Sequence, residues 1–443
     1  MEYLYLHVLV TIFIAVYTAK WGYFKILKIA KVKNLVDNPD ARKLQKDPVP
    51  VMGGIAVFWG LTMGLMVSVA YYSIVGLPIA RDLLPVFLVI CVMLYVGAID
   101  DILGLTPLVR LLIETLITLC IIYSTHGCID SLHGFLGIDS FSWDIGVPLT
   151  VFCSVGIINA INMIDGVNGL SSGLCILCSF IYGVVFIVAG DVTNACLAFA
   201  MMGALLPFFV HNVFGIRSRM FLGDGGTMMM GAMLSWFTIS IIRSDSPYHY
   251  FDGLGRANMP AFALAALSVP VFDTLRVMTF RMIHGGSPFK PDKTHIHHGF
   301  IRVGFSHLFT SFCIVSINLI NILVWIIAAF VFHVDATTQI FVVIVSSISL
   351  VWGSYYFLRY FSAQSAVNSR RLAKLGVKPL YGRRRRFRGF SEWLDAPEDG
   401  WDLDSFDVKA HLERRFQHAA PKTQEEDEEY KKSGLYGKDE QRE

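Results

Sequence analysis

The chain has 443 residues, of which 54% are hydrophobic and only 16% are charged, and its formal net charge is +2. Ordinary soluble domains carry a charge on about a quarter of their residues, so this composition excludes a typical soluble protein. Apolar runs of about 20 residues recur from Leu4 to Phe357, and a helix of that length crosses a bilayer. The runs are continuously apolar rather than alternating, which excludes a membrane β-barrel.

The apolar runs predict an all-α polytopic membrane domain at residues 1–361, with about eleven transmembrane helices and a count of ten as the alternative. Residues 362–443 are polar, and we expect them to form a basic, then acidic, partly disordered cytoplasmic tail. Within it, RRRRFRGF at residues 383–390 indicates either an anchor on membrane lipids or a topology signal. The predicted spans are centred near Val16, Gly64, Val92, Thr118, Val155, Tyr182, Ala200, Leu234, Ala265, Leu323 and Val345.

Basic residues in the short loops predict the orientation, because cytoplasmic loops carry an excess of lysine and arginine. Loops 31–50, 213–225 and 281–306 are basic, whereas loop 125–146 has no lysine or arginine and loop 72–82 has only one. We therefore expect a multi-pass protein of the cell inner membrane, with its N-terminus outside and its C-terminus in the cytoplasm. The same orientation puts the four polar motifs described next on the cytoplasmic face, which indicates a single active site.

The first polar motif is VGAIDDILGL at residues 96–105, where Asp100 and Asp101 end an apolar span. A charge in this setting is costly unless it is paired or hydrated, and two adjacent carboxylates repel each other unless a cation is near. The pair therefore indicates a functional cation site. The alternative is an interfacial pair that only ends the helix.

The second motif is NAINMIDGVNGLSSG at residues 159–173. Asn159, Asn162 and Asp165 recur every three residues and would share one side of a helix. The glycines that follow would let the backbone turn and approach a ligand closely. Helix capping would explain Asp165 and Asn168 but not the two amides within the span, so we expect a binding site.

The third motif is FLGDGGTMMMG at residues 221–231. An acid such as Asp224, in a glycine-rich turn at a helix start, can present both a carboxylate and backbone N–H groups. That combination suits a metal ion and a phosphate together. The alternative is a plain N-cap, with Gly225 as a turn residue.

The fourth motif is SPFKPDKTHIHHGF at residues 287–300, whose two prolines predict a loop rather than a helix. His295, His297 and His298 are too close together to supply three ligands of a tetrahedral zinc site, and no cysteine lies nearby. We expect the histidines and Lys293 to donate to phosphate oxygens, with a histidine able to transfer a proton. The alternative is a loop that binds anionic lipid headgroups.

Together the four motifs predict a site for phosphoryl chemistry. Carboxylates without thiolates favour Mg²⁺, with Mn²⁺ as the alternative, over zinc. Cationic donors beside such an ion indicate a phosphorylated substrate, such as a diphosphate, at the membrane face. No feature of the sequence indicates binding to nucleic acid. The remaining motif, the CxxC of Cys175 and Cys178, lies inside an apolar span, and we interpret it as packing rather than redox chemistry.

Five segments resemble, in sequence and in order, the motifs of the polyprenyl-phosphate N-acetylhexosamine-1-phosphate transferases: VMGGIAVF, IDDILGL, NAINMIDGVNGL, FLGDGG and SPFKPDKTHIHH. The resemblance spans residues 37–305, and the histidine segment is most similar to that of members that use undecaprenyl phosphate and UDP-N-acetylglucosamine (UDP-GlcNAc). It implies transfer of N-acetylglucosamine 1-phosphate from UDP-GlcNAc to undecaprenyl phosphate, giving undecaprenyl diphosphate-GlcNAc and UMP. Such a reaction is the first membrane step in the assembly of cell-surface polysaccharides.

The resemblance also implies roles for single residues. Asp224 matches the metal-binding acid, Asp101 lies beside the metal and the diphosphate, and Asp100 matches an acid that either deprotonates the lipid phosphate or attacks as a nucleophile. We favour a single displacement with Asp100 as the base, since a lipid phosphate is already a competent nucleophile. Phe221 matches an aromatic that stacks on uracil. The candidate substrate-binding residues are Lys46, Asn159, Asn162, Asp165, Asn168, Phe221, Lys293, His295, His297 and His298.

Two positions depart from the family pattern. Asn168 stands where relatives often have an aspartate, so it keeps a hydrogen-bonding group without the charge. Gln45 stands where a histidine is common, and a glutamine cannot transfer a proton.

Other functions fit parts of the pattern. Another UDP-amino sugar or UDP-MurNAc-pentapeptide is the alternative donor within the same reaction class. An ion-coupled transporter would also carry acids in its spans, but near mid-membrane and in repeated halves. Here the acids lie at helix ends and no internal repeat is visible. Membrane lipids are expected partners, and a homodimer is compatible with the sequence.

Overall fold

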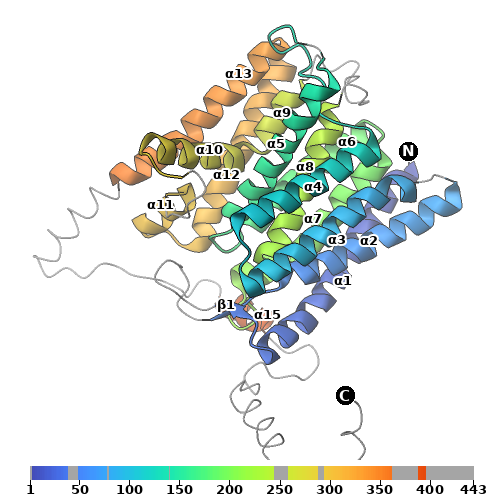
Figure 1. The fold of residues 1–443 in the computed structure, drawn as a ribbon. Coiled ribbons are helices and arrows are strands. Elements are labelled where there is room, and N and C mark those ends of the chain that lie inside the picture. Colours follow the sequence, from blue (N-terminus) through green and yellow to red (C-terminus); the bar gives the residue numbers. More distant parts are fainter. Residues whose placement is uncertain are drawn as a thin grey trace, which may run out of the picture.

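The computed structural model describes residues 2–37, 48–76, 79–138, 140–243, 258–287, 294–361 and 388–395. These residues form a helical bundle with one short antiparallel ribbon, in which β1 (Val36–Asp37) pairs with β2 (Val49–Pro50) (Figure 1). Ten of the described helices are long and apolar enough to span a membrane, which confirms the all-α polytopic prediction. They are α1 (Glu2–Val32), α2 (Gly53–Val75), α3 (Ile79–Leu103), α4 (Pro107–Thr125), α5 (Trp143–Met163), α6 (Leu170–Val188), α7 (Val192–Phe214), α8 (Gly223–Ile242), α12 (His307–Ile326, continued by η2, Ile327–Val331) and a last helix that begins as α13 (Ala336–Ser347) and continues through η3 (Ile348–Trp352) to Phe361.

The outer surface of the bundle is apolar. Leu88 on α3, Phe152 on α5 and Phe312 on α12 expose 60%, 74% and 67% of their surface. Large apolar side chains exposed on several helices are unfavourable in water but favourable against lipid chains. The surface therefore agrees with a multi-pass membrane protein.

Helix α8 lies at the centre of the bundle. In its 18-residue apolar stretch 94% of the residues are buried, compared with 28% in α4. A helix that is apolar on all sides is expected in such a position, and the sequence TMMMGAMLSWF of α8 has that character. Helices α2, α3, α5 and α6 pack around it (Figure 1). Residues at the first turn of α8 are therefore surrounded by several helix ends.

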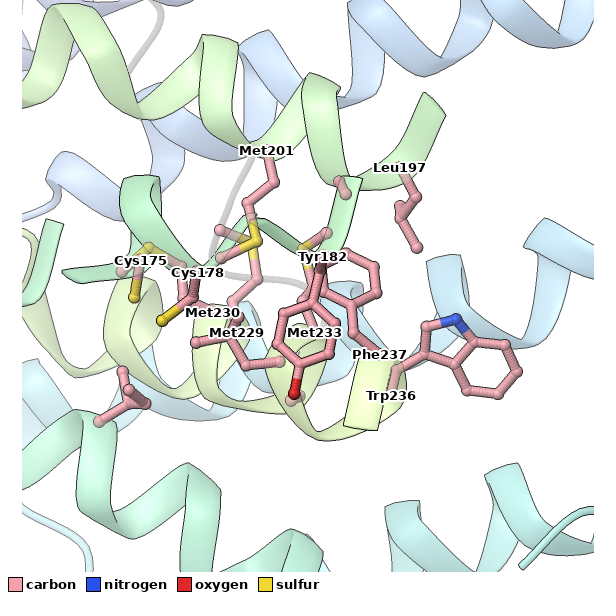
Figure 2. Close-up of a cluster of buried hydrophobic side chains, with 14 of the residues drawn as sticks. Cys175, Cys178, Tyr182, Leu197, Met201, Met229, Met230, Met233, Trp236 and Phe237 are labelled. Atoms are coloured by element: carbon pink, nitrogen blue, oxygen red, sulfur yellow. The ribbon is translucent and has the colours of Figure 1, made fainter. Parts of the chain in front are cut away.

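The two cysteines of the CxxC segment are part of the core. Both are completely buried as free thiols, and Figure 2 shows them beside Met229, Met230 and Tyr182. The Cys178 thiol donates to a backbone carbonyl, that of Ala266, at 3.2 Å. This arrangement agrees with a packing role.

The span predicted near Ala265 is broken. Helix α9 (Met259–Ala266) and helix α10 (Ser268–Ile283) meet at an angle of 75°, so the bundle has ten spans, or eleven if this pair is counted as one. Pro270 explains the break, because it has no N–H to donate to the carbonyl of Ala266. That carbonyl instead accepts from the side-chain amide of Asn318 at 2.8 Å, and the Asn318 oxygen accepts from the N–H of Val269 at 3.0 Å.

The histidine segment is partly helical, so the prediction of a loop throughout residues 287–300 was wrong. Helix α11 (Ile296–Val303) begins directly after His295 and contains the other two histidines of the motif. The two prolines of the segment precede the helix in the sequence, and a proline breaks a helix only from a position inside that helix. Figure 1 shows α11 beside α10 and α12.

Candidate active site

Glycines let α2 and α3 approach the start of α8. A Cβ on Gly97 of α3 would lie 2.4 Å from the Cα of Gly225, and a Cβ on Gly54 of α2 would lie 2.5 Å from the Cα of Gly226. Side chains do not fit at such distances, so both positions require glycine. Gly223, with φ of +78°, starts α8 in the left-handed region that suits glycine. This packing brings the carboxylates of α3 and α8 to one end of the bundle.

Asp101 caps α8 from the neighbouring helix. Its Oδ1 accepts from the backbone N–H of Asp224 at 3.0 Å, and its Oδ2 accepts from the N–H of Gly225 at 3.4 Å. A carboxylate is favourable here because the N-terminus of a helix carries partial positive charge. Asp101 therefore positions Asp224, while each of its oxygens keeps further acceptor capacity.

Arg110 lies between Asp100 and Asp224. Its Nη1 is 2.9 Å from Oδ2 of Asp100 and 3.8 Å from Oδ2 of Asp224, and its Nη2 donates to Oδ1 of Asn162 at 2.9 Å. Asp100 is buried and also accepts from the N–H of Leu105 at 2.6 Å. Arg110 therefore supplies a cation for Asp100 from within the chain.

Sequence reasoning missed Arg110 and its neighbour Glu114. They are the only charged residues of α4 and stand four residues apart in an otherwise apolar segment, which was the available signal. The two asparagines of the second motif bind different partners. Asn159 donates to Oε2 of the completely buried Glu114 at 2.5 Å, whereas Asn162 donates to Oδ1 of Asp224 at 2.8 Å. A network thus joins α4, α5 and α8.

Asp165 lies in the turn after α5 rather than on the helix, because α5 ends at Met163. The three-residue spacing from Asn159 therefore continues past the end of the helix into this turn. Its Oδ1 accepts from the hydroxyl of Ser171 at 2.5 Å. Asn168 is used through its backbone, whose carbonyl accepts from the hydroxyl of Ser311 at 2.8 Å. That bond packs the turn against α12.

Helix α10 holds the start of the histidine segment. Asp273 accepts from Nδ1 of His295 at 2.8 Å and from the N–H of Ile296 at 3.1 Å, so it caps α11. Arg276 contributes an ion pair to the same carboxylate at 2.7 Å. The bend after α9 thus places Asp273 where it fixes His295. Sequence reasoning did not identify Asp273 or Arg276, although charges are uncommon within apolar segments.

His297 packs against the turn that contains Asp165. A Cβ on Gly166 would lie 2.4 Å from Nε2 of His297, so the glycine of MIDG makes room for the imidazole. Burial, together with the nearby His298 and His295, lowers the pKa of His297 well below its ordinary value. His297 is therefore neutral at pH 7 and would contact a ligand as a neutral group. A neutral imidazole keeps one N–H, so donation to a phosphate oxygen stays a prediction for this residue.

We expect His297 to make the folded protein less stable in acid. Because its pKa is lowered in the folded state, the unfolded chain binds the proton more tightly. Stability is therefore full above the ordinary histidine pKa of about 6.5 and falls as the pH drops below it. Thermal unfolding midpoints of the detergent-solubilised protein between pH 5 and 8 should show this slope, and His297→Gln should flatten it. As a control, substitution of the exposed His284 by glutamine should leave the slope unchanged. An unchanged slope in His297→Gln as well would contradict the lowered pKa of His297.

The remaining candidates divide into two groups. Phe221 extends the ribbon, since its N–H donates to the carbonyl of Pro50 at 2.8 Å and its carbonyl accepts from the N–H of Gly53 at 2.9 Å. It lies three residues before Asp224 and is half-buried. Lys46 and Lys293 lie outside the described residues.

The site offers the oxygen donors that Mg²⁺ prefers, without a complete cage. Among the described residues, no three His, Cys, Asp or Glu side chains converge to hold a metal ion. Asp100 is paired with Arg110 and Asp101 with backbone N–H groups, whereas the side chain of Asp224 is 36% exposed. Proteins often hold Mg²⁺ through one or two carboxylates plus substrate phosphates. The residues fit a metal ion bound in that way.

Comparison with known proteins agrees with this geometry. Residues 83–242 match the model of glycosyl transferase family 4. Over 288 residues, covering 63% of this chain and 72% of the relative, the chain is 30% identical to the undecaprenyl-phosphate alpha-N-acetylglucosaminyl 1-phosphate transferase of Escherichia coli O157:H7. This chain belongs to the polyprenyl-phosphate N-acetylhexosamine-1-phosphate transferases. The transferase is also 29% identical, over 302 residues, to the decaprenyl-phosphate N-acetylglucosaminephosphotransferase of Mycolicibacterium smegmatis, covering 65% of this chain and 73% of that relative.

The region matched by the family model contains the whole hydrogen-bonded network described above. In this transferase it includes Asp100, Arg110, Asn162 and Asp224, whereas the histidine segment lies beyond its end at residue 242.

Proposed function

We propose that this transferase moves N-acetylglucosamine 1-phosphate from UDP-GlcNAc to undecaprenyl phosphate and releases UMP. The observation that carries the proposal is the network of Asp100, Arg110, Asn162 and Asp224, contributed by four helices at one end of the bundle. Phosphoryl transfer depends on positioning and charge neutralisation, which such a network supplies. The names of the two relatives provide the sugar and a polyprenyl phosphate acceptor.

In the proposed reaction, an oxygen of the lipid phosphate attacks the β-phosphorus of the nucleotide sugar. The bond from that phosphorus to the bridging oxygen breaks, and UMP leaves with the electron pair. Asp100 accepts the proton if the lipid phosphate is protonated. Arg110 pairs with Asp100 at rest, and the oxygens of an incoming diphosphate would compete for its guanidinium group. That competition would free the Asp100 carboxylate for the proton.

We propose Mg²⁺ as the cofactor, with Asp224 as its main protein ligand and Asp101 holding that acid in place. Bound Mg²⁺ would neutralise the diphosphate oxygens of the substrate. We place the site at the cytoplasmic face of the inner membrane. The acids lie at the same ends of the predicted spans as the basic loops, and basic loops are typical of the cytoplasmic side. The gathering of the acids at one end of the bundle does not fit a transport pathway through its middle.

The identity of the sugar can be tested by product analysis. Purified protein would receive undecaprenyl phosphate and, in parallel, UDP-GlcNAc, UDP-GalNAc, UDP-MurNAc-pentapeptide or UDP-glucose, with lipid products identified by mass spectrometry. We expect the highest kcat/KM with UDP-GlcNAc and none with UDP-glucose, which lacks the 2-acetamido group. A higher value for another amino sugar would replace GlcNAc in the proposal. Repeating the assay with decaprenyl phosphate tests the lipid.

A further inference from the structure

A short segment of the C-terminal tail is docked on the bundle. Helix α15 (Arg388–Leu394) lies against the end of α7, where the ring of Phe390 meets that of Phe214 edge-on at 5.3 Å between centroids. Ser391 and Leu394 are buried in this contact. Sequence reasoning treated this stretch only as part of a basic tail, and the anchoring role for RRRRFRGF does not require such a contact.

The docked segment ends in a carboxylate that binds the loop between α7 and α8. Asp395 Oδ2 accepts from the N–H groups of Ile216 and Arg217 at 3.2 and 2.9 Å. Its Oδ1 accepts from the N–H and the hydroxyl of Ser218 at 3.0 and 2.6 Å. Three successive backbone N–H groups that converge on one carboxylate form an anion-binding turn, and hydrogen bonds to a charged acceptor are about twice as strong as neutral ones.

The same loop leads directly into the candidate active site. The carbonyl of Ser218 accepts from the buried Tyr23 hydroxyl at 2.7 Å, and the carbonyl of Met220 accepts from Asn212 at 2.8 Å. Phe221 follows, hydrogen-bonded to the ribbon, and Asp224 comes three residues later. Asp395 therefore fixes the beginning of a chain segment whose end carries the predicted uracil-stacking ring and the predicted metal ligand.

We propose that residues 388–395 act as a clamp and that Asp395 is a positioning residue for the nucleotide-sugar site. Without the clamp, three backbone N–H groups and one hydroxyl of the loop at residues 215–222 would lose their acceptor, the Asp395 carboxylate. Phe221 and Asp224 would then sample more positions. The effect on substrate binding rests on the proposed function, whereas the docking itself does not.

Asp395→Ala in the full-length chain separates these two parts. Amide hydrogen exchange, followed by mass spectrometry, should speed up by about tenfold or more at residues 216–218, because a charge-assisted bond to each amide is lost. The KM for UDP-GlcNAc should rise by about tenfold with kcat changed by less than about threefold, since positioning rather than chemistry is affected. Asp395→Asn, which keeps one carbonyl oxygen, should be intermediate.

The controls make each outcome decisive. Asp335→Ala also removes a helix-capping carboxylate, but at the start of α13, and it should leave both readouts unchanged. Phe390→Ala removes the ring contacts with Phe214 and Trp393 but leaves Asp395 in place, and it should reproduce the faster exchange if docking involves the whole helix. Unchanged exchange in Asp395→Ala would overturn the docking, and faster exchange with an unchanged KM would overturn the positioning role. A wild-type protein without transferase activity would instead refute the proposed function, while the exchange result would still decide the docking.

Discussion

Asp224→Asn should lower turnover by about 10³-fold while leaving a folded protein. The carboxylate is partly exposed at the first turn of α8, accepts from Asn162 and faces Arg110 at 3.8 Å. Asparagine has nearly the same shape and keeps one oxygen, so the loss would come from the negative charge that holds a metal ion and orients the diphosphate. Effects of this size are common when one group that stabilises transition-state charge is removed.

A suitable control for Asp224→Asn is another aspartate at the first turn of a helix, far from the site. Asp191 caps α7 at the opposite end of the bundle by accepting from the N–H of Asn194 at 2.9 Å. Asp191→Asn should reduce stability modestly and leave turnover per folded molecule unchanged. Full activity in Asp224→Asn would remove this residue from the mechanism, and Asp100→Asn can be judged in the same way.

Arg110→Met should lower turnover by about 10²-fold. The substitution leaves Asp100 buried without its cation and removes the donor to Asn162, so the orientation of both is lost. Arg110→Lys should recover only part of the activity. Lysine restores the charge as a single point, whereas the guanidinium group contacts Asp100 and Asn162 through two different nitrogens.

Initial rates of UMP release by variants of matched monodispersity would check this expectation. Arg359→Met, which removes an exposed cation near the end of the last described span, serves as the control and should behave as the wild type. If Arg110→Met and Arg110→Lys both keep wild-type activity, Arg110 is only a structural partner of Asp100.

The sequence predicted the helical spans well because their signal is local. A run of about 20 apolar residues is long enough to cross the bilayer as a helix wherever it lies in the chain. The break between α9 and α10 was not predicted, because it depends on a partner from elsewhere. Pro270 removes a donor, but a sharp bend is tolerated only because Asn318 of α12 satisfies the groups that are left. Pairing over such a distance in sequence is not visible in hydropathy.

The same reason explains which site residues were found. Asp100, Asp101 and Asp224 stand out because an acid at the end of an apolar run is costly. The partner of each acid was not predictable, because it depends on which helix ends meet in the folded chain. Asp101 caps α8, whereas Asp100 pairs with Arg110. Asn159 and Asn162 have the same spacing signal, yet they face different partners in the folded chain.

The most direct measurement is the release of UMP by purified protein given undecaprenyl phosphate and UDP-GlcNAc, with Mg²⁺ or with EDTA. We predict UMP release that requires both substrates, stops in EDTA, returns when Mg²⁺ is restored and is nearly absent in Asp224→Asn. No UMP from any UDP-amino sugar, by protein shown to be folded, would contradict the proposed reaction. UMP release that continues in EDTA would contradict the role proposed for Asp224 and Mg²⁺.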